Sequence, residues 1–492
     1  MSSGQKADPA TVEQAEHIGA SSLLFDTPEE VAAQKSMLRK LDLILLPLVS
    51  LSYLMAYIDR NNIGYARLMG LQKDLKLSGS QFYNSVMVFY AGYIALIFPA
   101  NFLLRKLGPK IQLGLAVITF GVFVTCYCTS RGYADLIGLR FAVGGAEALL
   151  QSAPLYLVIW YGRHELGRRI AFFYSATTIS GVFSGLIAYG IQTTMEGVGG
   201  RTSWQWLFLI EGVIAIALGC VNAVALPNLP EKIKTSKIFT PTELLVARKR
   251  SSEHNVENPK FRTDQVLASL KDPKTWLLAL LAACNSTILA STGAFLPTIV
   301  KEFGFTAVRA QLFTVIPYAV AFVSMIAIGY FSDRMRVKAY FIIGSLTSCL
   351  IGLVILISTT GKTAGIFAAC LLVGGAYPAS VLQIAWIQIT FCGNTKRATS
   401  WGVAMIFGQG LSMSGAQIYK DPPRFFMGHG VLIGYVTMGL VCTVLARALM
   451  VRDNRNRDAI VQDYQTRGER HPDLDKDFEE TCDKHISFRY IV

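Results

Sequence analysis

Twelve stretches of about 20 mainly apolar residues divide this chain, and they constrain its fold more than any other feature. A helix needs about 20 such residues to cross the hydrocarbon core of a bilayer. Inside a bilayer, only helices and closed barrels satisfy their own backbone hydrogen bonds. The runs therefore predict an all-α integral membrane protein embedded in the lipid bilayer. We expect spans near 41–62, 82–104, 111–129, 134–158, 168–192, 204–226, 275–299, 310–332, 339–358, 363–389, 397–419 and 428–450.

The composition agrees with this class and excludes several others. Only 16% of the residues are charged, against about 25% in soluble domains. The formal charge of +13 is typical of cytoplasmic loops that face anionic lipid, and we expect no nucleic-acid partner. The nine cysteines show no metal-like spacing, so neither a metal nor a cofactor is expected.

The spans fall into two groups of six. We expect an N-terminal half at 41–226 and a C-terminal half at 275–450, joined by a hydrophilic linker at 227–274. The tails, 1–40 and 451–492, are polar enough to be largely disordered. Ten Lys and Arg residues in the linker place it in the cytoplasm by the positive-inside rule, together with both termini.

An internal repeat relates the two groups of spans. The segment NFLLRKLGPK at 101–110 and the segment GYFSDRMRVK at 329–338 each follow the second span of a half. The sequence VGGA occurs at 143–146 and again at 373–376. These matches have offsets of 228 and 230 residues, which favours two related six-helix halves. Transporters built in this way bind their substrate between the halves, near the bilayer midplane.

With these motifs, the chain resembles the major facilitator superfamily. GYFSDRMRVK is similar to the family's loop signature, with Arg336 where a second glycine is usual. Further phrases resemble one branch, the anion:cation symporters typified by fungal allantoate, nicotinate and pantothenate permeases. Those phrases are IDRNNIGYAR, PANFLLRKLGPK, RFAVGGAEA, WQWLFLIEG, LPNLPEK and FLPTIVKEFG. The resemblance implies twelve transmembrane helices in two pseudo-symmetric halves, and we expect the plasma membrane as its location. Because each chain contains both halves of the pathway, we expect a monomer.

Arg140 and Glu147 are the first candidates for chemistry. They are seven residues apart, nearly two helical turns, and so project from one face of the fourth span. An ionised side chain at mid-membrane costs about 2.5–3.5 kcal/mol on insertion scales and needs a partner or water. One interpretation is a static ion pair. The other is that Glu147 gains and loses a proton while Arg140 tunes its pKa, and the resemblance favours this second interpretation.

Asp59 and Arg60 end the apolar part of the first span. By position alone, they are equally well explained as an ordinary acid and base at the membrane interface. The resemblance implies a second coupling carboxylate at Asp59 and a substrate-binding guanidinium at Arg60, which matches a carboxylate bidentately. Tyr57 and Tyr93 match family positions that line the same cavity, although membrane tyrosines are commonly belt residues.

Other positions complete the predicted site. Thr177, Gln383 and Gln409 are polar residues near span centres and are candidates for substrate binding. The resemblance also implies that Asp333 and Arg334 control gating on the cytoplasmic side. Asn62 and Gly64 are interpreted as helix-packing residues, and Glu211 is weighted towards a structural role.

No nucleotide-binding, hydrolase or dinucleotide motif is visible, so we expect no enzyme. The leading prediction is a secondary active transporter, specifically a proton-coupled symporter of a small organic anion that works by alternating access. One alternative is proton-coupled efflux of drugs or secondary metabolites on the same fold. Another is a transport-inactive nutrient sensor. The expected partners are therefore the anion, protons and lipid.

Overall fold

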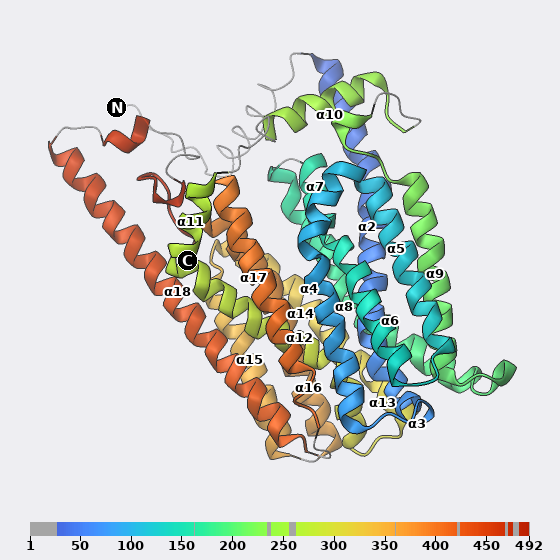
Figure 1. The fold of residues 1–492 in the computed structure, drawn as a ribbon. Helices are drawn as coiled ribbons and strands as arrows, with labels where there is room; N and C mark the ends of the chain where they lie inside the picture. Colours follow the sequence, from blue (N-terminus) through green and yellow to red (C-terminus); the bar gives the residue numbers. More distant parts are fainter. Residues whose placement is uncertain are drawn as a thin grey trace, which may run out of the picture.

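The computed structural model describes residues 27–161, 163–233, 238–254, 262–359, 361–420, 424–467, 471–475 and 482–491. Within these ranges, all regular structure is helical (Figure 1). The first half contains α2 (Pro28–Leu68), α3 (Leu71–Asp74), α4 (Gly79–Leu107), α5 (Pro109–Cys126), α6 (Tyr133–Ala148), α7 (Ala153–Trp160), α8 (Arg163–Thr194) and α9 (Ser203–Ala225). The linker contains α10 (Pro241–His254) and α11 (Thr263–Lys271). The second half contains α12 (Pro273–Glu302), α13 (Ala307–Phe313), α14 (Val315–Met335), α15 (Ala339–Ser358), α16 (Lys362–Thr390), α17 (Asn394–Gly415) and α18 (Phe426–Arg467).

These helices match the predicted spans. Nine helical stretches of the described residues are long and apolar enough to cross a bilayer. The other three predicted spans correspond to α4, to α6 with α7, and to α17. Between α6 and α7 the chain tightens into a 3-10 turn, η2 (Leu149–Ser152), just before Pro154 in the first turn of α7. A proline there has no N–H for the preceding turn, so this span is divided rather than continuous.

The two halves touch near one end of the molecule. Figure 1 shows them meeting at the end that carries α3 and α13 and diverging towards the end that carries α10 and α11. The contacts between halves join α2 to α12, α4 to α17, and α8 to α13 and α14. The hydrogen bonds across this junction include Tyr65–Thr314, Tyr83–Tyr419, Gln192–Gln311 and Asn84–Gln417. We call this junction the closed end.

Gly64 allows the closest approach across the junction. A Cβ at this position would lie 2.3 Å from the backbone oxygen of Ala294 on α12, which is far inside normal contact. The interpretation of Gly64 as a helix-packing residue is therefore confirmed. Gly181 on α8 is similar, because its added Cβ would lie 2.2 Å from the ring of Tyr318 on α14.

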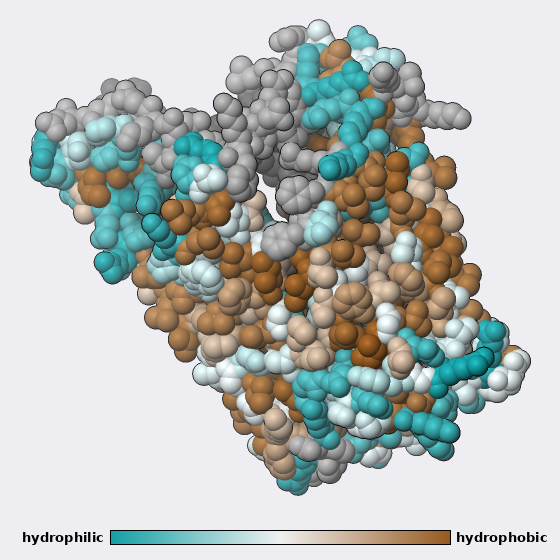
Figure 2. All heavy atoms as spheres, in the orientation of Figure 1, coloured by the Kyte–Doolittle hydropathy of each residue, from teal (hydrophilic) through white to brown (hydrophobic). Residues whose placement is uncertain are grey.

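The outer surface has the character expected in lipid. Figure 2 shows a broad apolar band over both halves, with hydrophilic side chains gathered at the two ends. Large apolar side chains point outward in this band, among them Val224 at 77% exposure and Val323 at 65%. A soluble protein rarely exposes a continuous apolar surface of this kind.

The described parts of the polar tails differ from the expected disorder. Helix α2 already begins at Pro28, capped by Thr27, and α18 continues to Arg467. Residues 482–491 fold back against the second half, where Asp483 binds Lys396 at 2.5 Å and the Trp386 indole donates to the backbone oxygen of Ile491. Composition does not reveal such contacts because each depends on a partner far away in the sequence.

Candidate functional site

Four charged side chains from α2 and α6 form two ion pairs inside the first half. Both Nε and Nη2 of Arg60 lie 2.6 Å from Oε2 of Glu147. Nη1 of Arg140 donates to Oδ2 of Asp59 over 3.2 Å. Three of the side chains are at most 2% exposed, whereas that of Arg60 is 16% exposed. Arg60 is therefore the charged group of this set that a ligand reaches most easily.

The pairing crosses between helices instead of running along one. The sequence places Arg140 with Glu147 on one helix face, but seven residues rise about 10 Å along the axis. Asp59 and Arg60 are adjacent on α2 and point about 100° apart, so each meets α6 at a different level. As a result, Arg140 pairs with Asp59, and Glu147 pairs with Arg60.

Aromatic rings surround the Arg60 guanidinium. Its Cζ lies 4.7 Å from the ring centre of Tyr57 and 5.1 Å from those of Phe89 and Tyr93. The Cζ atom of Arg140 lies 5.2 Å from the ring centre of Phe89, so both arginines contact this ring. Such contacts hold a cation without neutralising it. The predicted residues Tyr57 and Tyr93 are thus placed around Arg60.

Phe89 is the neighbour of both arginines that sequence reasoning missed. It lies four residues before Tyr93 on α4, which puts both rings on one face of that helix. That spacing is the signal that would have found it. Phe89 lies beside both guanidiniums and so contacts both ion pairs.

A third acid lies close to the two pairs. Glu211 on α9 is 5% exposed and accepts a hydrogen bond of 2.7 Å from the side-chain nitrogen of Asn62 on α2. Asp59, Glu147 and Arg140 all lie within its electrostatic reach. Asn62 therefore does more than pack helices, since it links α2 to a buried acid. Within the described residues, no group of acids, His or Cys is arranged to hold a metal ion.

The remaining substrate candidates are neutral side chains. Thr177 is buried on α8 and donates to the backbone oxygen of Tyr174 over 2.8 Å. Gln383 is buried on α16 and accepts from Asn285 of α12 over 3.3 Å. Gln409 on α17 is half-buried. The polar candidates of the second half thus supply amides rather than charges.

The predicted gating pair lies at the end opposite the closed end. Asp333 forms an ion pair with Lys338, and Arg334 donates to the Tyr330 hydroxyl over 3.2 Å. Both contacts stay within the second half. In this conformation the pair is not brought to the first half.

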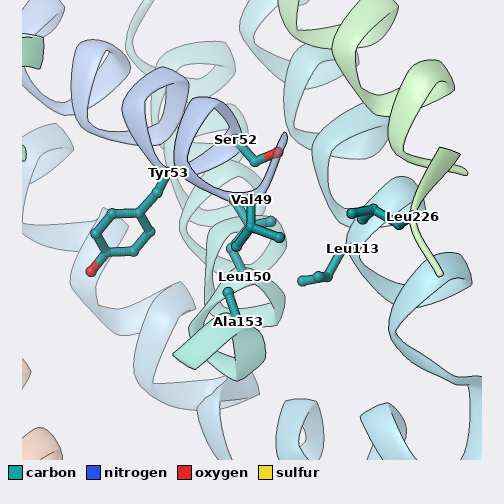
Figure 3. Close-up of a pocket in the computed structure, with 7 residues that line it drawn as sticks. All are labelled: Val49, Ser52, Tyr53, Leu113, Leu150, Ala153 and Leu226. Carbon is teal, nitrogen blue, oxygen red and sulfur yellow. The ribbon is translucent and has the colours of Figure 1, made fainter. Parts of the chain in front are cut away.

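An apolar recess lies inside the first half. It is lined mainly by apolar side chains, with Ser52 and Tyr53 as its polar members (Figure 3). No charged group lines it. The ring of its lining residue Tyr53 lies 5.0 Å from that of Tyr57, so the recess borders the aromatic residues around Arg60.

Comparison with known proteins defines the family. A sequence model of the Major Facilitator Superfamily matches residues 49–416. The high-affinity nicotinic acid transporter of Saccharomyces cerevisiae is 32% identical over 468 residues, covering 93% of this chain and 85% of that protein. The MFS-type transporter cnsO of Penicillium expansum is 34% identical over 445 residues, covering 87% and 86%. This chain belongs to the major facilitator superfamily, a family of secondary transporters, and is a multi-pass membrane protein.

Solved structures show the same fold. The inward open conformation of the xylose transporter of E. coli matches with a TM-score of 0.65 at 13% identity, covering 82% of this chain and 94% of that one. A bacterial homolog of the human lysosomal transporter Spinster, in an inward-facing conformation, matches with a TM-score of 0.60 at 16% identity, covering 82% and 95%. The prediction of a major facilitator fold with two six-helix halves is confirmed.

Proposed function

We propose that this transporter is a proton-coupled symporter that imports a small organic anion, of the vitamin-like carboxylate class, across the plasma membrane. The observation that carries the proposal is the position of Arg60: it is the most exposed of the paired charges and is ringed by three aromatic side chains. A guanidinium recognises a carboxylate bidentately. The printed name of the nicotinic acid transporter supports an aromatic carboxylate as the first substrate to test.

In this mechanism the substrate carboxylate and Glu147 compete for Arg60. Protonation of Glu147 weakens its hold on the guanidinium, and the substrate carboxylate takes its place. The rings of Tyr57 and Tyr93 then pack against the apolar part of the substrate. The Asp59–Arg140 pair provides a second carboxylate that accepts a proton. Thr177, Gln383 and Gln409 line the path and set the fit.

Transport requires the closed end to open and the opposite end to close. With both termini in the cytoplasm, the present conformation faces inward, and its closed end faces outward. The halves at 41–226 and 275–450 rock about the site, in the manner of alternating access. Asp333 and Arg334 hold the cytoplasmic end when that end closes.

The proton gradient supplies the energy. Symport of a monoanion with one proton is electroneutral and gains about 1.4 kcal/mol per pH unit. A second proton makes the cycle electrogenic and adds about 2.3 kcal/mol per 100 mV. Two paired carboxylates are compatible with either stoichiometry, so the number of protons is a separate measurement.

The test is uptake of labelled nicotinate and a panel of other carboxylates in a permease-deficient host, at about pH 5 and about pH 7.5. We expect acid-stimulated uptake that is lost in Arg60→Ala and in Glu147→Gln. Arg201→Ala, which removes an exposed arginine far from the cluster, serves as the matched control. If the wild type is present at the surface but takes up no anion at either pH, the importer proposal fails and efflux of the same anions is tested next.

A further inference from the structure

Among the described residues, the buried charged cluster of the first half contains more acids than bases. Asp59, Glu147 and Glu211 face only two guanidiniums, those of Arg60 and Arg140. With every group ionised, this buried set carries a net charge of −1. Charges at this depth are costly unless they are paired. One proton on one of the three acids removes the imbalance.

The geometry distinguishes the three acids by their partners. Asp59 and Glu147 each face a guanidinium, which has N–H donors and no acceptor and therefore favours the ionised carboxylate over the protonated one. Glu211 faces the amide of Asn62 instead. Its second oxygen, Oε1, is buried without a hydrogen-bond partner, as are the second oxygens of Asp59 and Glu147, and the Oδ1 atom of its neighbour Asn62 is also unpartnered.

An amide can serve a carboxyl group in both protonation states. Its nitrogen donates to an ionised carboxylate, and its oxygen accepts from a protonated one. A half-turn of the Asn62 amide exchanges these two groups at nearly the same positions. Asn62 is fully buried, and Glu211 is the ninth of 23 residues in α9, well inside the span. The partner of Glu211 is thus suited to reversible protonation.

We propose that Glu211 is a third proton-binding carboxyl group of this transporter, with Asn62 as the amide that accommodates both of its protonation states. The proposal rests on the proposed proton-coupled function and deepens it. Glu211 stores the proton that balances the buried charges. It exchanges that proton with the neighbouring acids when Arg60 changes partner.

The charged and titratable side chains on the elements that pack against α9 near Glu211 are compatible with this role. On α2 and α6 these are Asp59, Arg140 and Glu147. The helices α5 and α8 carry charged side chains only in their first two turns. The nearby turn η1 (Tyr127–Thr129) contributes Tyr127, whose ring packs 4.7 Å from that of Phe208 on α9. No further charge from these elements competes for the proton.

Infrared spectroscopy tests proton binding without requiring a substrate. Spectra of the purified protein in lipid are compared between about pH 5 and about pH 8, in the C=O stretching region of protonated carboxyl groups. We expect a pH-dependent component that is lost in Glu211→Gln and kept in the surface control Glu196→Gln. Glu211→Gln keeps a hydrogen bond to Asn62, so a purely structural role predicts an unchanged fold and an unchanged spectrum. An unchanged spectrum overturns the proposal.

A second variant covers the case in which Glu211→Gln does not fold. Asn62→Leu keeps the acid but removes the donor that serves its ionised form. We expect the carboxyl component to be present at both pH values and to lose its pH dependence. A pH response equal to that of the wild type overturns the proposal.

Transport separates this proposal from the proposed function. With nicotinate as the probe, Glu211→Gln is expected to reduce the ratio of uptake at about pH 5 to uptake at about pH 7.5 towards one. A ratio equal to that of the wild type overturns the role of Glu211 while leaving acid-driven import intact. If the wild type itself shows no acid stimulation, the proposed function fails, and the infrared result alone decides whether Glu211 binds a proton.

Discussion

The two halves share a fold but differ in what they bury. The first half encloses three acids and two arginines between α2, α6 and α9. In the second half, the corresponding interior contact joins two neutral amides, Asn285 and Gln383. Buried charges are expensive and seldom kept without a use. If the proposed function holds, the first half handles the protons and the anion's charge, and the second half shapes the cavity around the substrate.

The two halves also share one kind of ion pair, at the end of the molecule opposite the closed end. Arg169, at the start of α8, holds Asp42 of α2 with distances of 2.6 and 2.7 Å. Lys396, at the start of α17, holds Asp272 at the start of α12 with a distance of 2.8 Å. Both pairs tie the fifth span of a half to its first span. In the second half, Asp483 of the C-terminal segment joins the pair and buries it.

The largest expected effect comes from removing a charge from the first half. Arg140→Leu leaves the buried Asp59 carboxylate without its cation, and breaking a buried pair in this way costs about 3–5 kcal/mol. Gln383→Leu in the second half removes one neutral hydrogen bond, worth about 1 kcal/mol. We expect a much lower apparent melting temperature for Arg140→Leu, measured on detergent-purified protein.

A double variant tests whether charge is the cause. Asp59→Asn combined with Arg140→Gln removes both charges and is expected to recover most of the lost melting temperature, without recovering acid-driven uptake. Equal losses in Arg140→Leu and Gln383→Leu would remove the distinction between the halves.

The sequence predicted the fold far better than the pairing inside the site. Runs of apolar residues are local, so the positions of the spans could be read directly. The partner of a charged residue depends on how two helices face each other, which no single helix reveals. For this reason Arg140 was paired with Glu147 of its own helix, whereas the structure pairs it with Asp59. The Asn62–Glu211 contact and the packing of residues 482–491 were missed for the same reason.

The next largest effect on stability concerns Asp483 and Asp42. These aspartates bind Lys396 and Arg169 at the end of the molecule opposite the closed end. Asp483→Asn weakens an ion pair whose side chains are 1% exposed, and we expect a loss of about 1–3 kcal/mol. Asp42 is 39% exposed, so Asp42→Asn is expected to cost about 0–1 kcal/mol. Apparent melting temperatures of the two variants, measured side by side, check the order. A larger loss for Asp42→Asn would show that the C-terminal segment does not stabilise the second half.

The stability that the Asp272–Lys396 ion pair provides is expected to be the same at about pH 5 and at about pH 7.5. Burial alone would raise the pKa of Asp272, but the charges of Lys396 and Lys274 outweigh it and hold the pKa below its ordinary value of 3.8. A lowered pKa gives stability that is fully present above 3.8 and is lost as the pH falls through the lower folded-state value. Asp272→Asn should therefore lower the melting temperature equally at about pH 5 and about pH 7.5. A smaller loss of melting temperature at about pH 5 than at about pH 7.5 would show that the stability of the second half also depends on protonation.

The smallest effect is expected from Gln409, a neutral side chain of the second half. Gln409→Asn shortens a half-buried amide on α17 by one methylene, and a change of that size alters binding by about 1–3 kcal/mol at most. If the second half shapes the cavity without handling charge, the variant changes which carboxylates are preferred and leaves the ratio of uptake at the two pH values unchanged. Competition by a series of unlabelled carboxylates against labelled nicotinate measures the first quantity, and uptake at each pH measures the second. A changed pH ratio with an unchanged order of competitors would reverse the assignment, because a neutral amide would then influence the protons without selecting the anion.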